Sequence, residues 1–275
     1  MPDESGPQAQ LIALDWGTSS LRAYLIGGSG RILDRRTEPW GIMQVPAGEF
    51  AARFDTITSS WRARWPRLPA LAAGMIGSAQ GWVEAPYCPC PAGPAELATR
   101  LVTVPNASLC IVPGVVQGGA GAVDARPDVM RGEETQIAGA LALRPMLHRE
   151  SRLVMPGTHC KWVDIKDGRI ARFTTYMTGE VFAVLRQHSI LGRLAGADTP
   201  PATPDSPAFL RGVDAARDAR NGVAPLLFSA RALVLAGRMP ASDSLDYLSG
   251  LLIGDELRNA LQPWAGMAAE AGLKL

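Results

Sequence analysis

The sequence predicts two α/β domains of similar plan with a cleft between them. Strand-like meanders precede helix-like segments once in each half of the chain, an order typical of α/β domains. A pattern of strand, Gly-Thr turn, strand, glycine turn and Arg-Ile strand start occurs over 11–32 and again over 152–170. A chain of 275 residues is also near the size at which a single core splits into two. We therefore expect a mobile tail over 1–10 and domains over 11–120 and 121–275.

The first copy of the pattern begins with Leu11–Leu14, an apolar run typical of a buried strand, and Asp15 ends that run. Gly17 and Thr18 form the turn, and the chain resumes as an extended segment over Leu21–Ile26. The backbone N–H groups of such a turn and the Thr18 hydroxyl can bind phosphate oxygens. Asp15 can hold Mg²⁺, directly or through water. An ordinary β-hairpin with a solvated Asp15 fits the same residues equally well.

The second copy has the same layout. Arg152–Pro156 predicts a strand, Gly157 and Thr158 the turn, and Lys161–Ile165 the next strand. Two such hairpins that face each other across a cleft could bind one polyphosphate from both sides. Coincidence is the alternative, because glycine turns between strands are common.

Composition excludes several classes of protein. The chain is 47% hydrophobic and 19% charged, so it can bury a sizeable core. Its net charge of +1 and the lack of a basic stripe argue against a nucleic-acid partner. The Cys88-Pro-Cys90 pair lacks the two-residue spacer of zinc and thioredoxin motifs, which favours reduced thiols in a cytoplasmic protein. The polar start over 1–10 predicts no signal peptide, and the apolar stretch 225–237 is too short to span a membrane.

Further elements follow from apolar spacing and turn residues. Helices are predicted over 49–65, 130–143, 180–191, 224–235 and 242–261. Short strands are predicted over 71–75, 102–104 and 109–112. Thr178 and Ser206 are expected to cap helices. Gly250 and Gly254 would allow the last helix to approach a neighbour closely.

The histidines give little sign of a metal site. No His, Cys and Asp set has ligand spacing, so a dedicated metal site is not expected. His159 lies in the second Gly-Thr turn, where it could contact a phosphate. His188 shares an apolar helix face, which favours a hydrogen-bonded core histidine.

Glu133 and Glu134 follow Gly132 at a predicted helix start. The partial positive charge of a helix N-terminus keeps a nearby carboxylate ionised, and such a group can accept a proton from a substrate hydroxyl. First-turn acids that only stabilise their helix are the reading that the local sequence favours.

Three other side chains could bind a sugar acid. Arg131 could hold a carboxylate in bidentate fashion, although a surface arginine is the default. Gln80 could contact hydroxyl groups and Trp82 could form an apolar wall, while a structured loop with a packed Trp82 is equally compatible.

Several motifs then resemble one family. Leu14–Ser19 resembles the first phosphate motif of the sugar kinases that share the actin and hexokinase fold. Five further segments are similar to the 2-dehydro-3-deoxygalactonokinase family: 74–82, 130–136, 156–162, 177–180 and 246–254. The resemblance covers residues 11–261. It implies two ribonuclease-H-like domains of the actin/hexokinase type around a central cleft that binds Mg²⁺, ATP and the sugar acid.

The resemblance also implies roles for single residues. Glu133 corresponds in position to the catalytic base of the wider carbohydrate kinase group, and Asp15 would organise Mg²⁺. The phosphate groups would be held by the two turns, that is by Gly17, Thr18, Ser19, Gly157, Thr158 and His159. The implied reaction is ATP-dependent phosphorylation of 2-dehydro-3-deoxy-D-galactonate to its 6-phosphate, in galactonate degradation.

One departure from the family pattern leaves a second function open. Family members carry a further strand, glycine turn and helix after the 242–261 helix, and the second domain here is expected to lack that βα unit. Because that unit covers adenosine, a weakly active or non-catalytic sugar-acid-binding relative is the alternative. The sequence is compatible with a homodimer but does not fix the oligomeric state.

Overall fold

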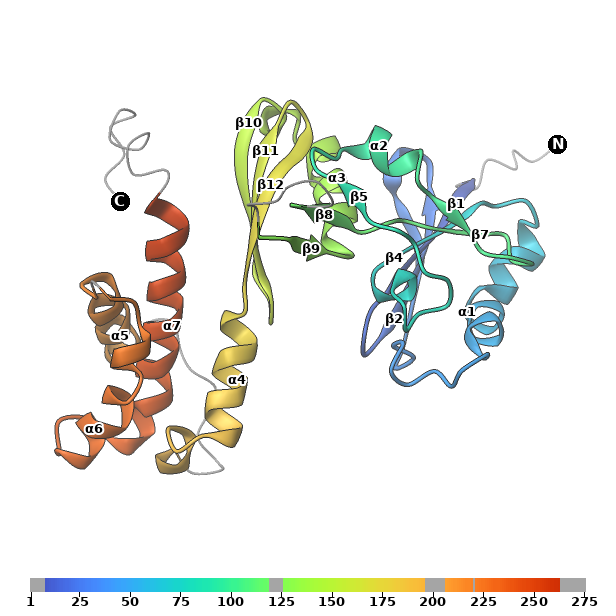
Figure 1. The fold of residues 1–275 in the computed structure, drawn as a ribbon. Helices are drawn as coiled ribbons and strands as arrows, with labels where there is room; N and C mark the ends of the chain where they lie inside the picture. Colours follow the sequence, from blue (N-terminus) through green and yellow to red (C-terminus); the bar gives the residue numbers. More distant parts are fainter. Residues whose placement is uncertain (1–7, 119–125, 196–205, 220, 263–275) are drawn as a thin grey trace. The chain divides into compact units, whose positions relative to one another are not determined.

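The computed structural model describes residues 8–118, 126–195, 206–219 and 221–262 (Figure 1). Contacts divide the chain into two units. Unit 1 holds the residues up to Leu153 together with Val163–Thr174, and unit 2 holds Val154–Trp162 together with the residues from Thr175 onward. The chain is a mixed α/β protein, as the sequence predicts. The predicted domain boundary between residues 120 and 121 falls outside the described residues and stays a prediction.

The main sheet of unit 1 has six strands in the order β3-β2-β1-β4-β7-β6 (Figure 1). Their bounds are β1 Ala9–Trp16, β2 Leu21–Gly27, β3 Ile32–Glu38, β4 Ala70–Ala73, β6 Val102–Thr103 and β7 Leu109–Ile111. Strand β1 runs antiparallel to β2 and parallel to β4, with Asp15 opposite Ala73. The carboxyl ends of β1 and β4 therefore lie at the same edge of the sheet.

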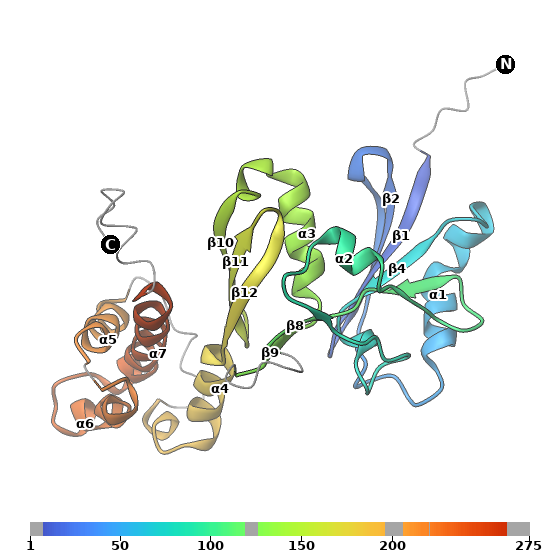
Figure 2. The same cartoon turned by 45° about the horizontal axis from the view of Figure 1, so that its top comes forward.

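Alternation along β1 explains how this sheet is buried. Ile12, Leu14 and Trp16 are buried, because side chains two residues apart share one face of a strand. Helix α1, Phe50–Arg64, lies against the sheet (Figure 1 and Figure 2). Its buried residues recur at helical spacing: Phe50, Phe54, Ile57, Thr58 and Trp61. The predicted helix over 49–65 and the strands over 71–75, 102–104 and 109–112 are thus confirmed, with shifts at their ends.

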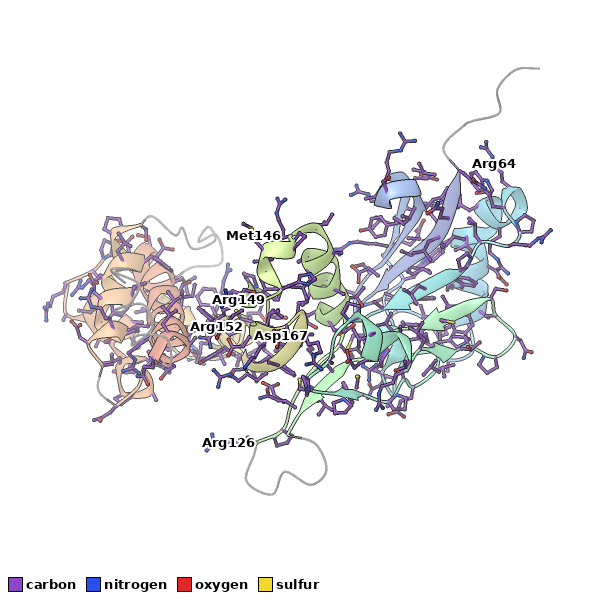
Figure 3. The ribbon with its side chains drawn as sticks, turned by 90° about the horizontal axis from the view of Figure 1, so that it is seen from above. Arg64, Arg126, Met146, Arg149, Arg152 and Asp167 are labelled. Atoms are coloured by element: carbon purple, nitrogen blue, oxygen red, sulfur yellow. The ribbon has the colours of Figure 1, made fainter. Side chains whose placement is uncertain are left out.

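Unit 1 also contains a small sheet in the order β5-β8-β9, with β5 Cys88–Pro89, β8 Val115–Gln117 and β9 Asp128–Met130. Helix α2, Pro94–Ala98, follows β5. Helix α3, Glu133–Leu143, follows β9 after a short turn. Met146 is exposed on the 3₁₀ turn η3, Pro145–Leu147, that follows α3 (Figure 3).

The second meander is a three-stranded sheet in the order β10-β11-β12, with β10 Glu150–Met155, β11 Cys160–Lys166 and β12 Arg169–Tyr176. Asp167, labelled in Figure 3, and Gly168 join β11 to β12. Their φ values are 51° and 71°. Two consecutive positive φ angles are what a tight hairpin turn requires, and Asp-Gly supplies them at low cost. Helix α4, Thr178–His188, follows β12. The order of three strands and a helix therefore occurs twice, as predicted.

Unit 2 ends in a helical layer made of α5, Pro207–Arg217, α6, Ser229–Leu235, and α7, Ser244–Leu261. The Ser206 hydroxyl accepts a hydrogen bond from Phe209 N at 3.0 Å, which confirms the predicted cap of α5. Helices α5 and α7 lie side by side (Figure 1 and Figure 2). Short 3₁₀ turns complete the chain: η1 Gly28–Gly30, η2 Met75–Gly77, η4 Gly192–Leu194, η5 Ala224–Leu226 and η6 Ala241–Asp243.

Small residues permit the contact between α5 and α7. A Cβ placed on Gly250 would lie 2.0 Å from Phe209 O, and one on Gly212 would lie 2.2 Å from Tyr247 O. A side chain at either position would force the helices apart. The close approach expected at Gly250 and Gly254 is confirmed.

We expect Gly250→Ala to lower the free energy of unfolding by about 1–3 kcal/mol, because the new methyl group overlaps a backbone carbonyl. Gly139→Ala is the matched control, since Gly139 lies in α3 and, among the described residues, its added Cβ would meet no neighbour outside the local helix backbone within 4 Å. That control should raise stability by about 0.5–1 kcal/mol through helix propensity. Thermal and urea denaturation measure both changes, and a Gly250→Ala protein as stable as the wild type would contradict this packing.

Three sequence expectations differ from the structure. Thr178 does not cap α4: it is the first residue of the helix, and its hydroxyl donates to Glu256 Oε2 instead. His188 is exposed rather than buried, because its face of α4 carries the exposed Val181 and Val184. The tail predicted over 1–10 is too long, because strand β1 begins at Ala9, which pairs with Gly27. Residues 1–7 lie outside the described part of the chain. Among the described helices, none is long and apolar enough to cross a membrane.

Candidate functional site

Asp15 stands near the carboxyl end of β1, where β1 runs beside β4. Its side chain is 43% exposed and its Oδ2 lies 3.1 Å from Nη1 of Arg22, the residue directly opposite on β2. The carboxylate is therefore accessible at the sheet edge and has one cationic neighbour. Such a carboxylate can bind a metal ion directly or through the water molecules of a hydrated ion.

The first Gly-Thr turn follows immediately. Gly17 N donates to Ser20 O at 3.0 Å, which closes the turn, and Thr18 and Ser19 are exposed on it. The segment around Gly41 packs against the turn, and Ile42 N donates a hydrogen bond to Gly17 O at 3.0 Å. A Cβ on Gly41 would lie 2.2 Å from Thr18 O, so only glycine fits there. The turn is thus held rigidly with its polar residues facing solvent.

Two glycines connect this turn to helix α3. Gly74 follows β4 with φ +99°, and a Cβ there would lie 2.8 Å from Trp16 O. Gly132 precedes α3 with φ +112°, and a Cβ there would lie 3.4 Å from Gly74 Cα. The backbone at the end of β1 therefore approaches the backbone after β4, which in turn approaches the backbone before α3. The structure brings the segments that carry Asp15, Gly17 and Glu133 together.

Glu133 and Glu134 begin α3 but have different surroundings. Glu133 is partly exposed, and its Oε2 accepts a hydrogen bond from Arg131 N at 3.2 Å. Glu134 is fully buried, and its Oε2 accepts from Gly132 N at 2.7 Å. Burial raises the pKa of the Glu134 carboxyl to about 7, against the opposing effect of its hydrogen bonds. Only Glu133 has the exposure that a base acting on a substrate requires.

Arg131 lies between Glu133 and the loop after β4. Its Nη2 donates to Ala85 O at 2.9 Å, and its guanidinium carbon lies 4.4 Å from the ring centroid of Tyr87. Its Nε and Nη1 are buried and have no hydrogen-bond partner within the described residues. A buried unpaired donor is costly, so these two groups favour an anionic or carbonyl partner.

Gln80 and Trp82 lie on the same loop but are used differently. Gln80 is exposed. Trp82 packs into an aromatic cluster with Trp16, Phe50 and Phe54, at ring-centroid distances of 6.4, 6.5 and 5.9 Å. The cluster supports the interpretation of Trp82 as a packed loop residue. The exposed Gln80 side chain is accessible to a polar ligand.

The second Gly-Thr turn belongs to unit 2 and is supported by α4. Gly157, Thr158 and His159 are exposed. Glu180 N donates to Thr158 O at 3.1 Å, and a Cβ on Gly179 would lie 2.7 Å from Gly157 O. His159 Nε2 pairs with Glu180 Oε2. Because the two turns belong to different units, their joint action on one polyphosphate stays a prediction.

A pocket of about 300 Å³ opens next to this second turn in unit 2. Its walls are mostly apolar and come from β10, β11, α4 and α7: Val154, Pro156, Gly157, Cys160, Trp162, Thr178, Gly179, Phe182, Ser249, Leu252, Ile253, Glu256 and Leu257. Glu256 is 8% exposed and accepts from Trp162 Nε1 at 2.7 Å and from Thr178 Oγ1. Burial, with Glu256 nearby, raises the pKa of the Cys160 thiol to about 12 and keeps it neutral. A flat apolar group with a polar edge fits such a pocket.

The donor set at Asp15 suits a metal that arrives with phosphate. Within the described residues, no three His, Cys, Asp or Glu side chains gather as a metal cluster. Mg²⁺ in phosphate-transfer sites is usually bound by one or two carboxylates, with the substrate phosphates and water as the other ligands. One accessible carboxylate beside a Gly-Thr turn fits that requirement.

The chain is an α/β protein, and an accessible carboxylate beside a Gly-Thr turn is an arrangement that suits the phosphotransferase class. The family model described as 2-keto-3-deoxy-galactonokinase matches residues 15–273, and the chain belongs to this family.

Individual relatives agree with that membership. A 2-dehydro-3-deoxygalactonokinase of Escherichia coli (strain K12) is 38% identical over 249 residues, which cover 90% of this chain and 80% of that protein. A Rhizobium meliloti (strain 1021) protein described as a probable 2-dehydro-3-deoxygalactonokinase is 42% identical over 254 residues, with 90% and 79% covered. The crystal structure of a proposed 2-dehydro-3-deoxygalactonokinase from Sinorhizobium meliloti matches with a TM-score of 0.79. It is 38% identical in sequence, with 91% of this chain and 81% of that chain covered.

Proposed function

We propose that the chain transfers the γ-phosphoryl group of ATP to the 6-hydroxyl of 2-dehydro-3-deoxy-D-galactonate in galactonate degradation. Family membership supports the kinase reaction and its sugar-acid substrate. The observation that carries the site is the contact from Trp16 through Gly74 to Gly132. This contact supports a site in which the accessible Asp15 and the first Gly-Thr turn, proposed here to bind phosphate, act together with Glu133 at the start of α3.

In the proposed mechanism Glu133 acts as the general base. Its carboxylate takes the proton of the 6-hydroxyl as the hydroxyl oxygen bonds to the γ-phosphorus. The bond from that phosphorus to the β,γ-bridging oxygen breaks, and ADP leaves with the electron pair. Gly17, Thr18 and Ser19 hold phosphate oxygens through backbone N–H and hydroxyl groups. Asp15 would hold Mg²⁺, which neutralises phosphate charge when it is bound.

The finer architecture is part of the same proposal. The repeated order of three strands and a helix supports two ribonuclease-H-like domains of the actin/hexokinase type. They would close around ATP and the sugar acid, with Gly157, Thr158 and His159 on the far side of the phosphates. We propose the cytoplasm as the location, and a homodimer stays compatible with all of these features.

The pocket beside Gly157 supports a place for the adenosine of ATP. The pocket and the turn share Gly157, so a ligand in the pocket can extend its phosphates to the turn without a break. Apolar walls suit a purine ring, and the buried Glu256 carboxylate can accept from an exocyclic amine.

We expect Ile253→Trp to raise the KM for ATP by about tenfold, because the larger side chain fills part of the pocket. A tenfold loss of affinity corresponds to about 1.4 kcal/mol of binding free energy. Ile253 lines the pocket and is 36% exposed, so the variant should fold. Val184→Trp, at an exposed α4 position outside the lining residues, is the matched control. Steady-state kinetics with varied ATP decide the point, and an unchanged KM would remove adenosine from this pocket.

The sugar acid is proposed to bind at Arg131 and at the loop that carries Gln80 and Trp82. The two unpaired donors of Arg131 support a contact with the substrate carboxylate, and the exposed Gln80 supports a contact with hydroxyl groups. Trp82 contributes through the loop that it anchors in the aromatic cluster.

The decisive test is turnover with defined substrates. Purified protein with Mg·ATP should release ADP in the presence of 2-dehydro-3-deoxygalactonate, and more slowly with the gluconate-derived epimer. Calorimetry with the same acid runs in parallel. Binding of the acid without ADP release would instead support the weakly active, sugar-acid-binding alternative.

A further inference from the structure

Glu134 is the buried acidic group beside the proposed base that the mechanism does not use. Its side chain is 0% exposed. Its Oε2 accepts from Gly132 N at 2.7 Å, and its Oε1 accepts from Thr135 Oγ1 at 3.1 Å. Both oxygens of the carboxyl group therefore bind to the turn that begins α3.

That turn has a backbone conformation that few residues adopt. Gly132 has φ +112°, which lies in the region that L side chains rarely occupy. A Cβ added to Gly132 would lie 3.4 Å from Gly74 Cα, and one added to Gly74 would lie 2.8 Å from Trp16 O, so the three backbone segments approach closely. The hydrogen bond from Gly132 N to Glu134 holds this peptide in place at the contact between α3 and the Asp15 strand.

A buried carboxyl group at this place is expensive for the fold, because burial opposes its charged form. Its pKa of about 7 reflects that cost. A leucine at the same position would pack against Ile137 and Leu141, which lie on the same buried stripe of α3. The carboxyl group supplies what an apolar side chain cannot, an acceptor for the Gly132 N–H.

We propose that Glu134 is a positioning residue: by accepting from Gly132 N it fixes the Gly132–Gly74 contact and thereby aims Glu133 at the substrate hydroxyl. The inference rests on the proposed function for the role of Glu133. A shift of about 1 Å in a reacting group can cost about 10²-fold in rate. Glu134 would therefore control kcat without touching substrate.

The test compares Glu134→Ala with Glu134→Gln. Glu134→Ala removes the acceptor, and we expect kcat to fall about 10²-fold with the KM values for ATP and sugar acid near wild type. Glu134→Gln keeps a carbonyl oxygen for Gly132 N, and we expect it to retain kcat within about tenfold of wild type. Gln136→Ala, at the neighbouring exposed position of α3, is the control and should behave as wild type.

Amide hydrogen exchange at Gly132 provides a readout that does not depend on turnover. We expect faster exchange in Glu134→Ala and near-wild-type exchange in Glu134→Gln. If Glu134→Ala does not fold, Glu134→Asp replaces it, because the shorter side chain should not reach Gly132 N.

Two kinetic outcomes would overturn the proposal. A wild-type kcat in Glu134→Ala would show that the turn needs no acceptor, and a Glu134→Gln protein as slow as Glu133→Gln would assign chemistry to Glu134 itself. If the wild-type protein shows no kinase activity, the proposed function fails. In that case the exchange measurement still decides the role of Glu134, since unchanged exchange at Gly132 would overturn it.

Discussion

Glu133→Gln is expected to lower kcat by about 10²–10⁴-fold, the range that a positioned general base contributes. Glutamine has nearly the same shape as glutamate but cannot accept a proton at neutral pH. Its carbonyl oxygen can keep the hydrogen bond from Arg131 N, which measures 3.2 Å. The fold and the KM for ATP should therefore stay near wild type, so that the loss falls on the chemical step.

Glu49→Gln is the matched control for this prediction. Glu49 is a partly exposed glutamate that pairs with Arg53 at 2.7 Å next to helix α1, so its replacement removes a carboxylate without touching the α3 start. Circular dichroism and thermal denaturation should place both variants within about 1 kcal/mol of the wild type, the usual scale of such exposed pairs. Equal kcat in Glu133→Gln and Glu49→Gln would deprive Glu133 of its role.

Local features of this fold could be predicted because they depend on neighbours in sequence. The first strand, which ends one residue after Asp15, the glycine turn at Gly168 and the Ser206 cap each depend on a few adjacent residues. The repeated pattern could also be found, because both copies use the same glycine turns and strand lengths. The turn at Gly17 and Thr18 is confirmed as a turn, while its binding of phosphate stays a prediction.

Contacts between distant segments could not be predicted in this way. Gly74 has no side chain, so the sequence gives no sign of its role. The structure shows that its backbone lies between those of Trp16 and Gly132. Thr178 was misjudged for the same reason, since its hydroxyl partner Glu256 lies far along the chain. The pocket in unit 2 combines segments around 154–162, 178–182 and 249–257, which share no sequence signal.

Glu134 lies between these two cases. It stands three residues before Ile137 and seven before Leu141, so helical spacing already assigns it to their buried stripe. An acidic residue on such a stripe is a conflict between pattern and chemistry. Conflicts of that kind are expected near functional sites, where a polar group is retained for its hydrogen bonds.

Asp15→Asn is expected to lower kcat by about 10²–10³-fold, the cost of removing one preorganised electrostatic group from a transfer site. Asparagine keeps the size of the side chain but loses the negative charge that would attract Mg²⁺. The variant should therefore require a higher Mg²⁺ concentration for half-maximal rate. Stability should change little, because the ion pair with Arg22 is exposed and such pairs contribute about 0–1 kcal/mol.

Asp55→Asn separates this effect from the loss of any surface carboxylate. Asp55 is 66% exposed and pairs with Arg62 at 2.5 Å on α1, so its replacement removes a comparable ion pair away from the sheet edge. Titration of Mg²⁺ at saturating ATP and sugar acid should shift for Asp15→Asn and not for Asp55→Asn. Equal titration curves for the two variants would show that Asp15 does not hold the metal, and the first Gly-Thr turn would then have to bind phosphate without it.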